Sequence, residues 1–234
     1  MAMAAATSTR SAKTQTTSHD DAWIAKQIVR ALGGRFSREL GIDVDRGGRE
    51  IERWFLAATL FGTRISADIA MRTYRVLDDA GVGIVADAGR RTWDDLVKLL
   101  DDGGYVRYDY STATRLQKLA DAVSAHRGRV TALLSSAEGK RDPVAALDAL
   151  PGWGPTTIRL FLREIGNTQA LDPRAEQAAR HLKLPVSKLD SIARRARLDP
   201  RDLEAALVRL SLRHTRDMKR CPGGARCAVI SAAA

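Results

Sequence analysis

The chain has 234 residues, of which 44% are hydrophobic, 5% aromatic and 28% charged. This balance excludes collagenous, fibrous and wholly disordered proteins, and the length suffices for one large domain or for two small lobes. Lysine and arginine number 38 against 28 aspartates and glutamates, and the resulting net charge of +10 indicates an acidic partner.

Residues 1–18 are mostly alanine, serine, threonine and glutamine, with two basic residues and no acidic one. Such a segment buries too little apolar surface to repay the entropy of ordering, so we predict a disordered tail. The segment lacks the apolar stretch that a secretory signal requires. Its composition weakly resembles a transit peptide, and an added cloning sequence is the alternative.

After this tail, apolar residues recur at helical spacing, and glycine and proline clusters separate the segments. These segments begin at Ile51, Trp93, Leu116, Ile158, Ala175 and Leu203. No segment alternates β-branched and polar residues, so a sheet is not expected. The sequence therefore predicts an all-α fold, with Ser66, Ser111 and Asp172 as N-caps of helices.

Neither a membrane span nor a disulfide framework is expected. The longest apolar run, Trp54 to Phe61 with Thr59 allowed, is far shorter than the roughly 18 residues that cross a bilayer. The chain has only two cysteines, which is typical of a protein kept in a reducing compartment such as the cytoplasm.

Residues 145–158, with the sequence AALDALPGWGPTTI, predict two helices joined by a tight hairpin. Pro151 stops the first helix, Gly152 and Gly154 give the backbone freedom to turn, and Pro155 opens the second helix. Unpaired backbone N–H groups around Gly154 to Thr157 would then face a phosphate at the positive end of the helix dipole. A plain helix–helix turn is the alternative.

The hairpin LPGWGPTT, together with the downstream sequence ALDPR at 170–174, resembles the helix-hairpin-helix DNA glycosylases, the superfamily of endonuclease III and the adenine glycosylase. The resemblance extends from about residue 45 to residue 227. It implies an all-α, two-lobe fold with a cleft between lobes. One lobe would comprise residues 19–45 plus 167–234, and the other would be a central bundle over residues 46–166 that contains the hairpin.

In this family an aspartate begins the helix after the hairpin helix, and Asp172 holds that position. The resemblance implies that its carboxylate stabilises the positive charge that develops on the sugar as the base leaves and orients the attacking nucleophile. A purely structural N-cap is the alternative, since an aspartate before a proline commonly starts a helix.

Bifunctional members carry a lysine two residues after the second hairpin glycine, where this chain has Thr156. Threonine cannot form a Schiff base, so the resemblance implies a monofunctional enzyme that uses water. Thr156 and Thr157 would bind phosphate or water, or would act as helix caps. Arg64 falls where the family places a residue that fills the gap left by the extruded base, and a solvated arginine is the alternative. Trp153 would pack beneath the hairpin or present its edge to DNA.

The sequence CPGGARC at 221–227 resembles the last two ligands of the family's four-cysteine iron–sulfur loop. Its spacing places the first two ligands at Ser211 and Met218, and neither side chain replaces a thiolate. We therefore expect no cofactor and no metal. Free thiols are the expected state of Cys221 and Cys227, with oxidation or adventitious metal binding as alternatives.

Residues 187–234 contain eleven basic and five acidic side chains, a net charge of +6. The arginines and lysine that would face DNA are Arg194, Arg195, Arg197, Arg209, Arg213, Arg216, Lys219 and Arg220. We expect a monomeric base-excision glycosylase in the cytoplasm, associated with the nucleoid, acting on double-stranded DNA with a damaged or mismatched base. A non-catalytic DNA-binding or lesion-sensing protein is the main alternative, and a lyase that uses another amine is the third.

Overall fold

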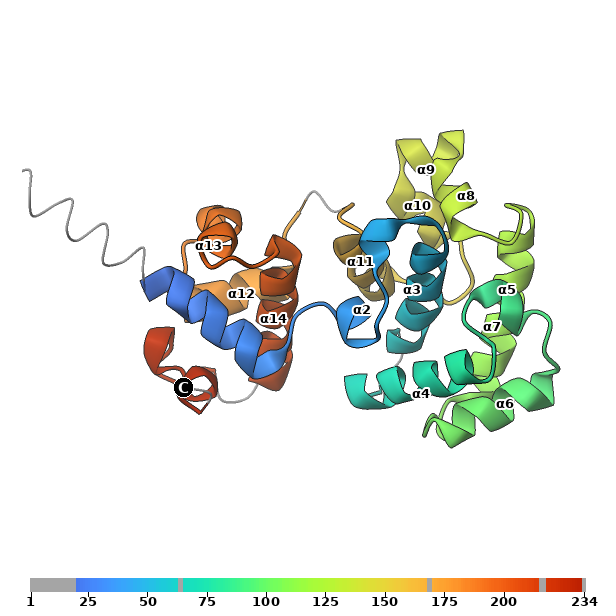
Figure 1. Cartoon of the computed structure of the whole chain (residues 1–234), viewed down its shortest axis with the longest axis horizontal. Helices are drawn as coiled ribbons and strands as arrows, with labels where there is room; N and C mark the ends of the chain where they lie inside the picture. Colours follow the sequence, from blue (N-terminus) through green and yellow to red (C-terminus); the bar gives the residue numbers. More distant parts are fainter. Residues whose placement is uncertain (1–19, 63–64, 168–169, 215–217, 233–234) are drawn as a thin grey trace, which may run out of the picture. The chain divides into compact units, whose positions relative to one another are not determined.

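The computed structural model describes residues 20–62, 65–167, 170–214 and 218–232 (Figure 1). Within these ranges the chain forms helices and connecting loops without a β-strand, which confirms the all-α prediction. No helix among the described residues combines the length and the apolar character that crossing a bilayer requires.

The chain divides into two compact units, each with its own core. Unit 1 comprises Met1–Phe36 and Gln169–Ala234, and unit 2 comprises Ser37–Thr168. The boundary expected at residue 45 lies inside unit 2, where the short helix η1 (Val44–Arg46) packs against α3 (Gly48–Phe61) and buries Val44.

Unit 2 consists largely of short helices joined by brief turns. After α2 (Phe36–Glu39), η1 and α3 they are α4 (Ala67–Asp79), α5 (Val85–Ala88), α6 (Trp93–Asp102), α7 (Asp109–Ser124), α8 (Val130–Ser135), α9 (Ala137–Arg141), α10 (Pro143–Asp148) and α11 (Pro155–Glu164). The central helix is α3, which contacts η1, α4, α5, α8 and α11 and is buried along most of its length. Its buried Glu52 accepts hydrogen bonds from the backbone N–H groups of Val130 and Thr131 at 3.0 and 2.9 Å, and so caps α8.

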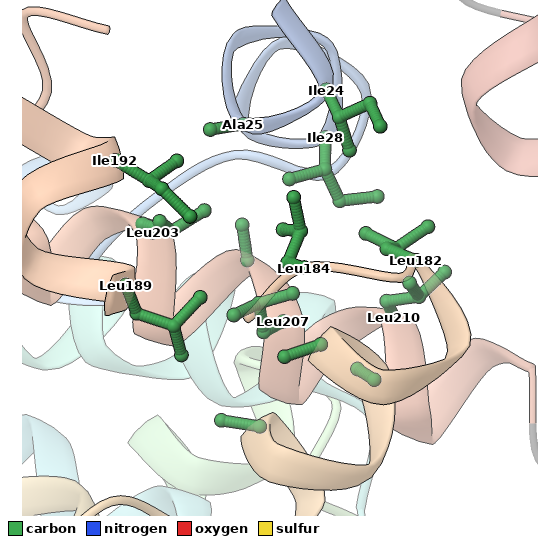
Figure 2. Close-up of a cluster of buried hydrophobic side chains, with 14 of the residues drawn as sticks. Ile24, Ala25, Ile28, Leu182, Leu184, Leu189, Ile192, Leu203, Leu207 and Leu210 are labelled. Carbon is green, nitrogen blue, oxygen red and sulfur yellow. The ribbon is translucent and has the colours of Figure 1, made fainter. Parts of the chain in front are cut away.

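Unit 1 combines a helix over residues 20–32 with the C-terminal part of the chain. Its further helices are α12 (Pro173–His181), η2 (Val186–Lys188), α13 (Leu189–Arg195), α14 (Pro200–Arg213), η3 (Gly224–Arg226) and α15 (Ala228–Ser231). Figure 2 shows its core, in which Ile24 and Ile28 of the first helix lie near Leu184 and Leu207. The buried face of α12 consists of alanines, which lets α12 and α14 pack closely.

The segment after the first helix is fastened to the start of α14 by a buried arginine. Arg35 is 1% exposed, and its guanidinium lies 3.3 Å from both Asp199 Oδ2 and Asp202 Oδ1. Its backbone N–H also donates to Asp202 Oδ1 at 3.0 Å. No local pattern indicates this role, because Arg35 lies more than 160 positions from both aspartates.

Two of the three predicted N-caps are confirmed. Ser66 Oγ accepts from the backbone N–H of Ile69 at 3.3 Å, and Asp172 caps α12. The prediction for Ser111 is wrong, because α7 begins earlier, at Asp109. Ser111 therefore lies inside the helix, and its hydroxyl donates to the carbonyl of Tyr108 at 3.0 Å.

Candidate functional site

The hairpin expected from the proline and glycine pattern lies between α10 and α11 in unit 2. Gly152 has φ +76°, a left-handed conformation that glycine adopts without strain, and Gly154 is the N-cap of α11. Pro155 is the first residue of α11, where a missing N–H is tolerated. The sequence thus predicts this helix, hairpin and helix correctly.

Backbone amides at the start of α11 are open to a ligand. Among the described residues, no acceptor takes the N–H groups of Gly154, Thr156 or Thr157, and the first bond within the helix runs from Ile158 N to Gly154 O. A Cβ built on Gly154 meets nothing within 4 Å. The hairpin therefore presents unpaired donors, with free space above the glycine, at the positive end of a ten-residue helix.

Trp153 lies beneath the hairpin, as the first of its two alternatives predicts. Its side chain is 4% exposed, stacks on Phe55 with ring centroids 4.4 Å apart, and meets Phe161 edge-on at 5.3 Å. Its indole N–H donates to Thr59 Oγ1 at 3.2 Å. The Trp153 side chain thus anchors the turn to α3. Its burial leaves mainly the backbone of residue 153 for the outer surface of the hairpin.

The two threonines differ. Thr156 is exposed at the start of α11, whereas Thr157 is 3% exposed. A Cβ built on Gly62 would lie 2.5 Å from Thr157 Oγ1, so this hydroxyl packs at the end of α3. Position 157 is thus on the buried face of the helix, and a role for its hydroxyl in binding phosphate or water stays a prediction.

The sequence did not indicate that Arg115 lies against the hairpin. Its side chain comes from α7, and a Cβ built on Gly152 would meet Arg115 Cδ at 2.3 Å. The Arg115 guanidinium donates to Thr112 Oγ1 at 3.3 Å. Position 152 therefore favours glycine for its positive φ, and the Arg115 side chain lies against it.

Asp172 belongs to unit 1, as the N-cap of α12. Its carboxylate accepts from the backbone N–H of Arg174 at 2.8 Å, and its own N–H donates to Glu204 Oε1 at 3.1 Å. The residue is 5% exposed. The structure thus confirms the capping role.

The tetrapeptide LDPR at 171–174 occurs a second time at 198–201. There Asp199 caps α14 and accepts from the backbone N–H of Arg201 at 2.9 Å. The contacts of Asp199 also include the Arg201 guanidinium, whose Nη2 donates to Oδ2 at 2.8 Å, and Arg35. The motif by itself is therefore a helix start.

Two predicted features lie outside the described residues, namely Arg64 and the tail over residues 1–18. Of the basic residues expected to face DNA, Arg216 also lies outside them. The expectation for Arg209 is wrong, because its guanidinium lies 3.7 Å above the Phe36 ring and donates to the carbonyl of Leu32 at 2.7 Å. The remaining six are exposed: Arg194, Arg195, Arg197, Arg213, Lys219 and Arg220.

The two cysteines are free thiols that lie in a cluster with two histidines. His181 is the last residue of α12 and His214 is the C-cap of α14. One nitrogen or sulfur atom from each of these residues and from Cys221 and Cys227 lies within 4.8 Å of the others. Neither histidine was predicted from the sequence, although the spacing H-x6-C-x5-C from 214 to 227 is a usable signal for His214.

The surroundings tune these groups. Burial raises the pKa of the Cys221 thiol, but hydrogen bonds from the N–H groups of Gly223 and Ala228, with His214, outweigh this effect and lower the pKa to about 7. Burial raises the pKa of the Cys227 thiol. Burial also lowers the pKa of His181, and the neighbouring His214 lowers it further. Neutral imidazole and thiolate are the forms that bind metals.

Comparisons with protein-family models, with curated proteins and with solved structures give no match to this chain.

Proposed function

We propose that the protein is a monofunctional base-excision DNA glycosylase, which hydrolyses the N-glycosidic bond of a damaged or mismatched base in double-stranded DNA. The observation that carries this proposal is the hairpin between α10 and α11, with unpaired amides on Gly154, Thr156 and Thr157. The order along the chain, with an aspartate at the start of the next helix, agrees with it.

The hairpin would bind a backbone phosphate. Its donors are backbone groups, so they recognise charge and shape without reading the base sequence. The Arg115 side chain beside Gly152 adds a positive charge to this site. Sequence-independent binding of this kind suits an enzyme that must inspect DNA of any sequence.

Asp172 would act on the extruded nucleotide. Water adds to C1′ of the sugar, the bond from C1′ to the base breaks, and the base leaves with the bonding electrons. A carboxylate beside the sugar stabilises the positive charge of this transition state and orients or deprotonates the water. Thr156 offers no amine, so the product is an abasic site in an uncut strand.

An excision assay tests the proposal with a control that the chain itself provides. Duplexes that carry alkylated, oxidised, deaminated or mismatched bases are incubated with the protein, and abasic sites are then cleaved with alkali. We expect release from at least one duplex, and a loss of about 100-fold or more in Asp172→Asn with DNA binding retained. Asp199→Asn changes the same residue in the second LDPR and should keep full activity.

A non-catalytic lesion-binding protein is the second candidate, favoured by the second LDPR, in which the aspartate serves as a helix cap and ion-pair partner. Tight binding to a lesion duplex without release from any duplex would support this candidate and contradict the glycosylase. Strand cleavage without alkali, or an adduct trapped by borohydride, would contradict the monofunctional mechanism.

A further inference from the structure

Four metal-binding side chains converge in unit 1 from three parts of the chain. They are His181 at the end of α12, His214 after α14, and Cys221 and Cys227 in the loop around η3. We propose that these four residues form a structural zinc site. This inference is independent of the proposed glycosylase activity and replaces the expectation that the chain binds no metal.

The donor set and its dimensions fit one zinc ion. Zinc prefers four tetrahedral ligands from cysteine and histidine, at about 2.3 Å for sulfur and 2.0–2.1 Å for nitrogen, which sets the ligand atoms about 3.3–3.8 Å apart. Here the four atoms lie within 4.8 Å of one another, and Cys227 Sγ is 4.0 Å from His214 Nε2. Closing around an ion therefore requires side-chain shifts of about 1 Å or less.

The cluster contains one buried polar atom that has no hydrogen-bond partner among the described residues. This atom is His181 Nε2. His214 is 7% exposed and Cys227 is fully buried. Since buried polar groups are normally paired, this arrangement indicates a missing ligand. The backbone N–H of Ala228 donates to Cys221 Sγ at 3.4 Å, which is a contact that stabilises a thiolate ligand.

An iron–sulfur cluster does not fit these residues. A cubane cluster requires four thiolates, and the positions that would supply two of them are Ser211 and Met218. Ser211 instead donates to Gln177 Oε1 at 3.3 Å. A binuclear cluster with two histidines binds the histidine pair and the cysteine pair to different irons, whereas these four atoms lie together.

The zinc would fasten the C-terminal segment to the core of unit 1. α12 and α14 already pack against each other, but η3 and α15 are short and bury little beyond Cys227 and Ile230. One ion bound to the ends of both long helices and to this segment would link the three. Its role would be to stabilise the fold, because four protein ligands leave no open position for substrate.

Metal analysis of the tag-free chain, purified under reducing conditions, tests the site. We expect about one zinc per chain after gel filtration in metal-free buffer, and protection of both thiols from alkylation until a chelator is added. Cys221→Ser and His214→Asn should lower the zinc content at least several-fold. His126→Asn is the matched control, because His126 lies in unit 2 and should leave the content unchanged.

The wild-type chain provides a second test that does not depend on any substituted variant. Unfolded and refolded with Co²⁺ alone, it should give the visible absorption of a tetrahedral cobalt site with thiolate ligands, and Zn²⁺ should abolish this absorption. Less than a tenth of an equivalent of zinc together with no cobalt spectrum would overturn the proposal. A Cys221–Cys227 disulfide in freshly purified reduced protein, or equal zinc content in all variants, would also overturn it.

Discussion

Asp172 and Asp199 begin two helices with the same tetrapeptide, but their surroundings differ. Burial raises the pKa of Asp199, whereas hydrogen bonds from the Arg201 side chain and backbone, with the charge of Arg35, lower it more, so that it lies below its usual value. Because Arg35 is almost fully buried, Asp199 also neutralises a cation that water cannot reach. Asp199 therefore has a structural role, in which it caps α14 and pairs with Arg35.

We predict that Asp199→Asn destabilises the protein by about 2 kcal/mol at neutral pH, because asparagine keeps the helix cap but loses the ion pairs. The pKa of Asp199 is lower in the folded than in the unfolded chain. Its stabilisation is therefore complete above the unfolded value of about 3.9 and is lost as the pH falls through the folded value. Urea unfolding of both proteins from pH 7 to about pH 2 measures the difference.

The difference in unfolding free energy between the wild type and Asp199→Asn should become smaller as the pH falls below about 3.9. Asp190→Asn is the control, because the Asp190 carboxylate is exposed and lies 3.8 Å from the equally exposed Arg194, so its removal should have little effect at any pH. A gap for Asp199→Asn that stays constant down to the lowest pH would show that the ion pairs contribute nothing.

At the scale of elements, the hairpin depends on one aromatic residue. Trp153 fills the space between α3 and α11. Its indole is hydrogen-bonded to Thr59, which itself donates to the carbonyl of Phe55 at 2.9 Å. The turn and the central helix of unit 2 are therefore coupled through this side chain.

We predict that Trp153→Ala destabilises unit 2 by about 3–5 kcal/mol and weakens DNA binding, because it leaves a cavity under the turn. Trp153→Phe should recover most of both losses. Trp93→Ala is the control, because Trp93 is 37% exposed and its removal opens no internal cavity. Urea unfolding followed by circular dichroism, together with binding to a lesion duplex, measures both effects. Equal losses in Trp93→Ala and Trp153→Ala would refute the anchoring role.

The loop between Cys221 and Cys227 depends on Gly223 in a different way. Gly223 has φ +66°, and a Cβ built there would lie 2.3 Å from the carbonyl oxygen of His181. The loop therefore approaches the end of α12 more closely than any side chain allows. Gly224 also has a positive φ, but its added Cβ would meet only the flexible Lys183 side chain, at 3.4 Å.

We predict that Gly223→Ala lowers both the zinc content and the thermal midpoint, because the loop must move away from His181. Gly224→Ala shares the strain of a left-handed alanine, about 1–2 kcal/mol, and should keep its zinc. Metal analysis and thermal unfolding of the two variants distinguish backbone strain, which both share, from displacement of the loop away from His181, which only Gly223→Ala should cause. Matching zinc content in Gly223→Ala and the wild type would contradict the close approach.

The elements could be predicted from sequence where their signals are local. The hairpin follows from Pro151, Gly152, Gly154 and Pro155, and Ser66 and Asp172 follow from the preference of short polar residues for helix starts. The features that could not be predicted depend on packing between residues that are far apart in the sequence. His181 and His214 meet because α12 packs on α14, and Arg115 reaches Gly152 from another helix.

At the scale of the whole molecule, the chain passes twice between two units that have separate cores. The positive charge is unevenly spread between them, since residues 187–234 alone carry +6 of the net +10. Arg209 is used internally, but Arg194 and Arg195 are exposed in the last turn of α13. Exposed cations release condensed counterions when they meet DNA phosphates, so their contribution appears in the salt dependence of binding.

We predict that replacing Arg194 and Arg195 together by alanine weakens DNA binding and makes it less sensitive to salt. Each lost phosphate contact should lower the slope of log K against log salt by about 0.9. Replacing Lys140 and Arg141 is the matched control, because they are also exposed in the last turn of a helix, α9, and their loss costs the same helix-dipole interaction. Fluorescence anisotropy with a labelled duplex over a salt series measures both slopes. Identical slopes for the two double variants would show that α13 does not face the DNA.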